Sequence, residues 1–179
     1  MALFHRIKIL EQADAIGAAV LDQLCDLDEV GSRLSIVSLK AAHGSYRGFE
    51  TYLCSEIHSP SVLMVMLRLA NPEPQKLLLY AEGFLSKLGK KLFKSQDLQI
   101  GDEKLDALVM VKSSAPESTL RLLQKPATIE ALLSLYERYP DSVTNDVSLR
   151  LKLADPTPGD LRDALDRLCQ VAESLGDHD

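Results

Sequence analysis

The sequence predicts an α+β protein, with a mostly antiparallel sheet packed by amphipathic helices near the N-terminus, the centre and the C-terminus. Apolar residues recur every three or four positions in residues 9–27 and 161–175, which is the period of a helix buried on one side. Residues 49–69 are rich in strand formers and are interrupted by turn residues. Residues 147–153 alternate strictly between apolar and polar side chains, as a half-buried strand does.

Length and composition are those of a soluble protein. The 179 residues suit one domain, so we expect a single α+β domain over residues 1–179, with its terminal helices at the periphery. The net charge of −6 argues against a general nucleic-acid binder, because duplex affinity depends on Lys and Arg that neutralise phosphates. The three cysteines form no CxxC pair, which indicates thiols in a reducing cytoplasm rather than disulfides or a zinc site.

No targeting or membrane-spanning segment is predicted. The start, MALFHRIKIL, places charges inside its short apolar run, unlike a signal peptide. The longest apolar run, residues 62–67, is far shorter than the roughly 20 residues of a spanning helix. We therefore expect a cytoplasmic protein.

The first half of the chain is expected to form a helix, three or four strands and a second helix. The first helix covers residues 9–27, and its apolar side carries Leu10, Ala13, Ile16, Ala19 or Val20, Leu24 and Leu27. Strands are predicted at residues 33–40, 49–57, 62–69 and 77–80, with a turn from Gly44 to Gly48. The run at 62–69 is apolar on both faces apart from Arg68, as in a central strand. The second helix is predicted at residues 83–93.

The second half begins with a turn at Gly101 that leads into a strand continuing to residue 112. Ser114 is expected to cap a short helix that ends near residue 124. Thr128 is expected to cap the next helix, with Ile129, Leu132, Leu133 and Tyr136 facing inward.

A turn at residues 144–146 then leads into a strand whose inward side chains are Val147, Leu149, Leu151 and Leu153. The final helix begins with Thr157 and Asp160 as a capping pair, and it ends at Gly176.

The turn at Gly101, Asp102 and Asp106 is the first candidate site. One hypothesis makes Asp102, Glu103 and Asp106 metal ligands, although a hard cation needs about six oxygens and three acids alone do not specify them. The favoured hypothesis is structural. In it Gly101 supplies a positive-φ turn, Asp102 accepts from nearby backbone N–H groups, and Asp106 faces water or pairs with a basic residue.

The same turn resembles a motif of a family of uncharacterised bacterial domains, written DI-x-TGD-x-x-FD-x-x-F-V-V. The resemblance runs from Asp97 to Leu153 and rests on Ile100-Gly101-Asp102, Leu105-Asp106, Val109-Met110-Val111, Leu122-Leu123, Leu132-Leu133 and Leu149-Leu151. Ile100 stands in place of the family's threonine, and Leu105 and Val109 stand in place of its aromatic residues. Many relatives carry the domain behind membrane spans. The resemblance implies a fold and a bacterial origin, with no established activity.

Catalytic motifs are not evident, and no cofactor is predicted. The four histidines, His5, His43, His58 and His178, show no metal-binding spacing. Cys54 and His58 would lie roughly 13 Å apart in a continuous strand, too far for a nucleophile and its base unless the chain turns between them.

Lys87, Lys90, Lys91 and Lys94 share one arc of the helix predicted at residues 83–93. Such an arc could contact an anionic membrane surface, at about 1 kcal/mol for each lysine, or an acidic protein. A solvated arc opposite an apolar one is also typical of any surface helix, and that interpretation is favoured. Pelleting with anionic vesicles at low salt distinguishes the two.

Two functional hypotheses follow. The favoured one is a non-catalytic module that binds a protein or peptide, or a second copy of itself, through a sheet edge or an apolar face. The alternative is an enzyme, such as a hydrolase, whose site combines acids near Asp102 and Asp106 with His43 or His58. A concave pocket that holds such groups would favour the enzyme.

Overall fold

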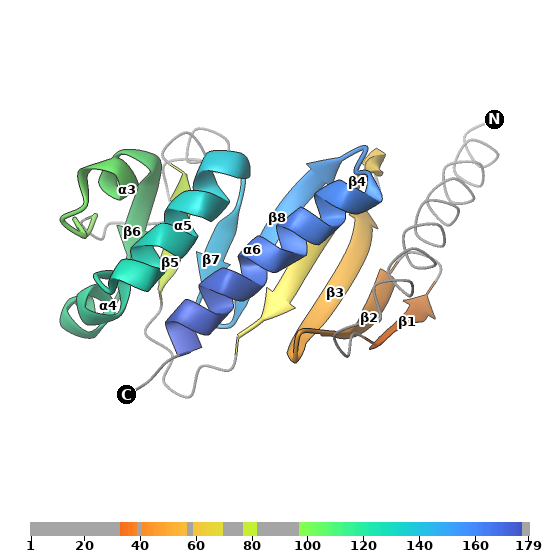
Figure 1. Ribbon diagram of the computed structural model, residues 1–179, viewed down its shortest axis with the longest axis horizontal. Helices are drawn as coiled ribbons and strands as arrows, with labels where there is room; N and C mark the ends of the chain where they lie inside the picture. Colours follow the sequence, from red (N-terminus) through yellow and green to blue (C-terminus); the bar gives the residue numbers. More distant parts are fainter. Residues whose placement is uncertain (1–32, 39–40, 57–58, 70–76, 82–96, 177–179) are drawn as a thin grey trace. The chain divides into compact units, whose positions relative to one another are not determined.

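The computed structural model describes residues 33–38, 41–56, 59–69, 77–81 and 97–176 (Figure 1). Within these ranges, the side chains of residues 33–43 and 55–61 are not described. Helices and antiparallel strands make up the described chain, which confirms the predicted α+β class. The helices expected at residues 9–27 and 83–93 lie outside the described residues.

The chain divides into two compact units. The first comprises residues 1–68 and 152–166, and the second comprises residues 69–151 and 167–179. The divisions fall inside strand β8 (Ser148–Ala154) and helix α6 (Pro158–Gly176), so each of these elements contributes to both units. The single domain expected from the length remains a prediction.

The first unit contains four antiparallel strands that follow one another in the sheet as they do in the sequence: β1 (Arg33–Ser38), β2 (Ala41–Tyr46), β3 (Phe49–Glu56) and β4 (Ser59–Arg68). The turn expected from Gly44 to Gly48 is shorter than predicted, because Gly44 belongs to β2. Only Arg47 and Gly48 connect β2 to β3, with positive φ angles of 48° and 86°. Two central residues of positive φ are typical of a tight hairpin, because their twist matches that of the strands.

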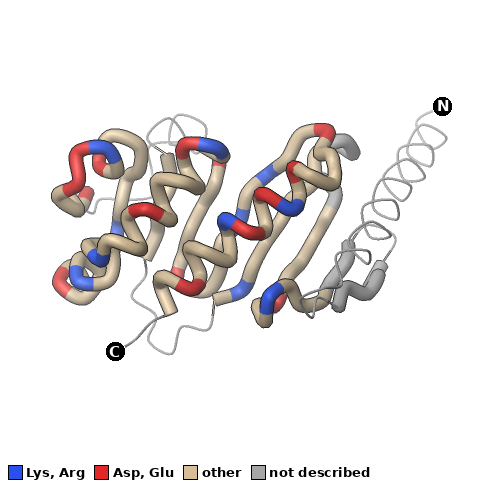
Figure 2. Tube along the Cα trace, in the orientation of Figure 1, with Lys and Arg blue, Asp and Glu red and all other residues tan. Residues whose placement is uncertain are grey.

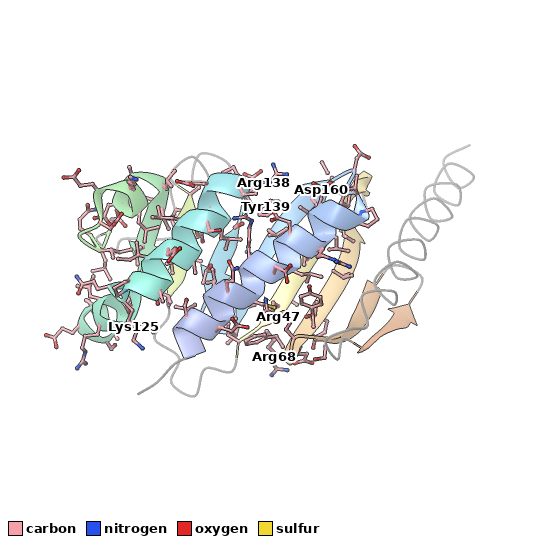
Figure 3. All side chains as sticks on the ribbon, viewed as in Figure 1. Arg47, Arg68, Lys125, Arg138, Tyr139 and Asp160 are labelled. Carbon is pink, nitrogen blue, oxygen red and sulfur yellow. The ribbon has the colours of Figure 1, made fainter. Side chains whose placement is uncertain are left out.

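Helix α6 begins in the first unit, where Figure 1 shows it crossing one face of the strands. Its start is the capping pair expected from the sequence. The backbone N–H of Asp160 donates to Thr157 Oγ1 at 3.2 Å, and the backbone N–H of Thr157 donates to the Asp160 carboxylate at 3.0 Å. Figure 3 labels Asp160 at this end of the helix. This reciprocal pair satisfies backbone donors that the first helical turn leaves open.

The second unit contains the antiparallel strand order β8-β7-β5-β6, with helices α3 (Glu103–Leu108), α4 (Pro116–Leu123) and α5 (Pro126–Arg138). Its other strands are β5 (Leu78–Ala81), β6 (Val109–Lys112) and β7 (Val143–Asn145). The centre of its core is fully buried and is formed by Leu79, Val111, Leu132, Leu135 and Leu149. Helix α5 closes this core with Tyr136, whose hydroxyl donates to the Leu79 carbonyl at 3.0 Å.

The strand expected from Gly101 to residue 112 is half helix, because Glu103–Leu108 form α3 and only Val109–Lys112 form β6. Asp102 explains the difference, since its carboxylate caps the first turn of α3 and favours helix over strand. Carboxylates near a helix N-terminus are also stabilised by the helix dipole, and Glu103 lies in that first turn.

The turn expected at residues 144–146 begins two residues later than predicted. Thr144 and Asn145 belong to β7, and the chain turns at Asp146 and Val147. Asn145 Oδ1 accepts from the backbone N–H of Val147 at 3.0 Å, which fixes the turn there. Val147 was expected to face inward with Leu149, but its position in the turn leaves it 57% exposed.

Two predicted helix caps are wrong. Ala115 rather than Ser114 precedes α4, and Lys125 rather than Thr128 precedes α5. In both helices a proline occupies the first turn, where its missing N–H costs nothing. Thr128 is instead fully buried inside α5, and its hydroxyl donates to the Ser174 carbonyl at 3.2 Å.

Candidate functional site

The turn before α3 is held by two carboxylates, those of Asp102 and Asp106, that accept hydrogen bonds from the backbone. Gly101 has φ of 94°, the positive value expected for it. Asp106 accepts from the N–H of Ile100 at 2.7 Å through one oxygen and from the N–H of Gly101 at 2.9 Å through the other. Asp102 accepts from the N–H groups of the next helical turn, at 3.1 and 2.9 Å. Asp106 was expected to face water or to pair with a basic residue; both of its oxygens accept from backbone N–H groups, and the side chain is half-buried.

Two further side chains brace the same turn. Asp97 accepts from the backbone N–H of Val111 at 2.8 Å, which joins the approach to the turn with β6. Gln124, at the end of α4, donates its amide to the Ile100 carbonyl at 2.8 Å. The polar side chains of this turn therefore hold the backbone in position. The side chain of Ile100, within the turn, is buried.

Metal binding at this turn finds no support in the geometry. Among the described residues, no group of three or more His, Cys, Asp or Glu side chains is placed to hold a metal ion. Both oxygens of Asp106 and one oxygen of Asp102 already accept from backbone N–H groups.

Beside the turn lies an open groove of about 540 Å³, formed by the start of α3, the outer side of α5 and one residue of α6. All of its lining residues belong to the second unit: Asp102, Lys104, Pro126, Ile129, Glu130, Leu133, Ser134, Glu137 and Arg167. The groove therefore begins at Asp102, the one residue it shares with the predicted turn site, and continues along α5.

The floor of the groove is apolar. Ile129 and Leu133 lie one helical turn apart on α5, and both are half-buried. They were expected to face inward with Leu132 and Tyr136, but only the latter two are fully enclosed. An α-helix buries one stripe of its surface, so apolar residues on the margin of that stripe remain accessible. At Ile129 and Leu133 this margin is covered only in part.

The rim of the groove carries charge of both signs. Glu130 and Glu137 are exposed on α5, and neither forms an ion pair within the described part of the chain. Figure 2 shows acidic positions near the middle and the end of α5. Lys104 is exposed on α3, whereas Arg167 is directed to α5, where it donates to the carbonyl of Ser134 at 2.9 Å and also to its hydroxyl. With Asp102, the rim has three acidic and two basic residues.

Among the residues whose side chains are described, no other predicted site residue lines the groove. Cys54 is half-buried in β3 of the first unit. His5, His58 and His178 lie outside the described residues, as do Lys87, Lys90, Lys91 and Lys94, and the side chain of His43 is not described. The enzyme alternative and the membrane contact of the lysine arc both remain predictions.

Comparison with known proteins reveals a fold similarity alone. No protein-family model and no curated protein sequence matches the chain. Among solved structures, the chain is similar to the crystal structure of the mycobacterial trehalose monomycolate transport factor A, TtfA. The TM-score is 0.51 and the sequence identity is 12%, over 76% of this chain and 71% of that one. At this identity the similarity supports the fold and says nothing of function. The resemblance to the uncharacterised bacterial family stays a prediction.

A membrane-spanning helix is not found in the described part of the chain, where every helix is too short or too polar to cross a bilayer.

The groove was not predicted, although the sequence contains a sign of it. Helix α5 has more apolar residues than one buried stripe accommodates, since Ile129 and Leu133 accompany Leu132, Leu135 and Tyr136. Such a surplus indicates that part of the apolar surface lies outside the core. The position of Arg167 beside α5 could not be predicted from residue spacing, because α6 and α5 are far apart in sequence.

Proposed function

We propose that this chain is a non-catalytic interaction module, which binds a short segment of another protein in the groove beside α5. The observation that carries the proposal is the apolar floor of Ile129 and Leu133 under a charged rim. A groove of this kind accommodates the apolar side chains of an amphipathic helix or an extended peptide. Its volume is in the range of roughly 300–1,000 Å³ typical of small binding pockets, so it would accept a few side chains rather than a whole domain.

The charge on the rim favours a segment that combines apolar with basic residues. Glu130 and Glu137 are seven residues apart on one helix, which places them about 10 Å from each other along α5. Leu133 lies between them in sequence, so basic side chains on both flanks of an apolar anchor at Leu133 would meet a carboxylate. Exposed charges of this type contribute to specificity and to the association rate more than to affinity.

The proposal is tested with peptides selected for the groove. A random 12-residue peptide library is panned against the wild-type chain and counter-selected against the Leu133→Glu variant. We expect enriched peptides that contain apolar and basic residues, and fluorescence anisotropy should show at least a ten-fold weaker affinity for Leu133→Glu. The matched control is Arg121→Glu on α4, an exposed charge change outside the groove. That variant should bind like wild type.

Two results would overturn the proposal. The first is a library that yields no peptide discriminated by Leu133→Glu. The second is a set of peptides that lose affinity equally in the Arg121→Glu control, since the effect would then come from net charge. Circular dichroism and thermal melts of both variants verify that each chain is folded, and the half-buried position of Leu133 makes a surface substitution there tolerable.

The cytoplasmic location and the bacterial origin also remain proposals. Cys54 and Cys169 form no disulfide, which is compatible with a reducing compartment.

A further inference from the structure

The part of the groove that α5 forms consists of two rows of side chains. Residues spaced by four stand in line on a helix, and such rows are the ridges between which a neighbouring helix packs. The lining residues of α5 fall into two adjacent rows of this kind: Pro126, Glu130 and Ser134 in one, and Ile129, Leu133 and Glu137 in the other. From the first to the last of these residues the furrow extends about 16 Å, or three helical turns. Its geometry is that of a surface against which another helix packs.

An extended peptide in the furrow would meet a cost that a helix avoids. Its backbone N–H and C=O groups would face the apolar side chains of Ile129 and Leu133, and a polar group that leaves water without a partner costs free energy. The backbone of α5 bonds mostly within its own helix, so it supplies few partners. A helical segment satisfies its own backbone and presents side chains to the groove.

Extended peptides are also bound by strand addition, which depends on an open sheet edge. In the second unit, β6 is the last strand in the order of the sheet. The backbone N–H of Val111 donates to the Asp97 carboxylate at 2.8 Å, and the Val111 carbonyl accepts from the N–H of Leu98 at 2.9 Å. The N–H of Val109 donates to the Leu105 carbonyl. A strand added to β6 would have to displace these bonds, which leaves the groove as the favoured surface of this unit.

The charges on the rim distinguish a helical segment from an extended one. Glu130 and Glu137 lie about 10 Å apart along α5. In a helix lying along α5, side chains about 10 Å apart belong to residues seven positions apart, whereas in an extended segment they belong to residues three positions apart. A second copy of α5 would bring its own two glutamates to the same rim, where like charges repel. The complement of this rim is therefore a basic segment of a different protein.

On the basis of the proposed function, we infer that the segment bound in the groove is an amphipathic helix of another protein. It carries two basic residues seven positions apart, which face Glu130 and Glu137, and apolar residues between them that pack on Ile129 and Leu133. Residues three, four and seven positions apart share one face of a helix, so one face supplies all of these contacts. Since an isolated helix of about twelve residues is marginal in water, such a segment folds when it binds.

Proline substitution in the bound peptide tests its conformation. The probe is the tightest 12-residue peptide enriched from the library, and the site is a central residue at which alanine is tolerated. Proline inside a helix removes a hydrogen bond and clashes with the preceding turn. Fluorescence anisotropy should show at least a ten-fold weaker affinity for the proline peptide, while the matched alanine peptide stays within about two-fold of the parent.

Charge substitutions test the spacing. Glu130→Gln and Glu137→Gln should each weaken binding about two- to five-fold, as expected for exposed ion pairs. Each loss should disappear when one of two basic residues seven positions apart in the peptide is replaced by alanine, because a double-mutant cycle isolates the pair. Arg121→Glu, outside the groove, is the control and should show no such coupling.

Three results overturn the helical partner. They are a proline peptide that binds as tightly as its alanine control, coupling to basic residues three positions apart, and enriched peptides that lack a basic pair. In each case the proposed function still holds if Leu133→Glu weakens binding of the same peptides. A library without any peptide discriminated by Leu133→Glu refutes both. A wild-type dimer that Leu133→Glu converts to a monomer in size-exclusion chromatography would place a second copy in the groove and also overturn the helical partner.

Discussion

Gly101→Ala tests whether the turn before α3 depends on a backbone conformation that glycine alone adopts easily. Gly101 has φ of 94°, in the region that L-residues with a Cβ rarely occupy. A Cβ built at this position would meet no atom within 4 Å, so steric overlap with neighbours makes no contribution. The cost is conformational strain alone, which we estimate at about 1–2 kcal/mol.

The free energy of unfolding is measured by urea denaturation of the full chain, followed by circular dichroism. A loss of 1 kcal/mol corresponds to a decrease in Tm of about 2–4 °C for a protein of this size. Gly101→Asn should lose less than Gly101→Ala, because asparagine tolerates positive φ better than alanine does.

The matched control is Gly176→Ala at the end of α6, where the Cβ would also meet nothing within 4 Å and φ is not positive. Alanine there should leave stability unchanged or raise it slightly, because it reduces the freedom of the unfolded chain. If Gly101→Ala unfolds at the same urea concentration as wild type, the strain argument is wrong and the turn can adopt another conformation.

Three other predictions concern polar groups with defined partners. Asp106→Ala should lower the free energy of unfolding by about 1.5–3 kcal/mol, because two backbone N–H groups lose a charged acceptor. Asp106→Asn should lower it less, since asparagine keeps one acceptor oxygen. Urea denaturation compares the two variants with wild type. Thr157→Ala should cost about 1 kcal/mol through loss of the α6 cap, and equal melting curves would contradict this. Tyr136→Phe should cost about 1–2 kcal/mol, because the buried Leu79 carbonyl loses its donor. Burial raises the pKa of Tyr136 above its ordinary value of 10.0, so the native state retains a proton that the unfolded state releases. Stability should therefore fall as the pH rises above about 10, less steeply in Tyr136→Phe, and melts between pH 9 and 11 measure this difference.

Strand and helix positions could be predicted well where one local signal was strong. The alternation after residue 147 predicts the buried side of β8, with Leu149, Leu151 and Leu153 inside. The capping pair of Thr157 and Asp160 predicts the start of α6. In both cases the period or cap involves residues close together in sequence, so the sequence contains the whole signal.

Errors arose where two local signals competed. At residues 103–108 the apolar alternation favours a strand, but the Asp102 cap favours a helix and prevails. At Thr128 the residue type is typical of a cap, but burial against the end of α6 decides its role. This second kind of error depends on a partner distant in sequence, which no local pattern reveals. The groove was missed for the same reason, since Arg167 approaches Ser134 only through tertiary packing.

The turn and the groove meet at Asp102, and stability and binding can be separated there. The Asp102 carboxylate holds the start of α3, so Lys104 on the groove rim depends on it for its position. Gly101→Ala strains the same turn, but it leaves Asp102 in place to accept from the backbone N–H groups of Lys104 and Leu105 in the folded molecules. The peptide affinity of the folded Gly101→Ala variant should therefore stay within about two-fold of wild type. Leu133→Glu should do the reverse, with loss of binding and little change in urea midpoint. If both variants lose affinity in proportion to stability, the groove is only a by-product of packing and the proposed function fails.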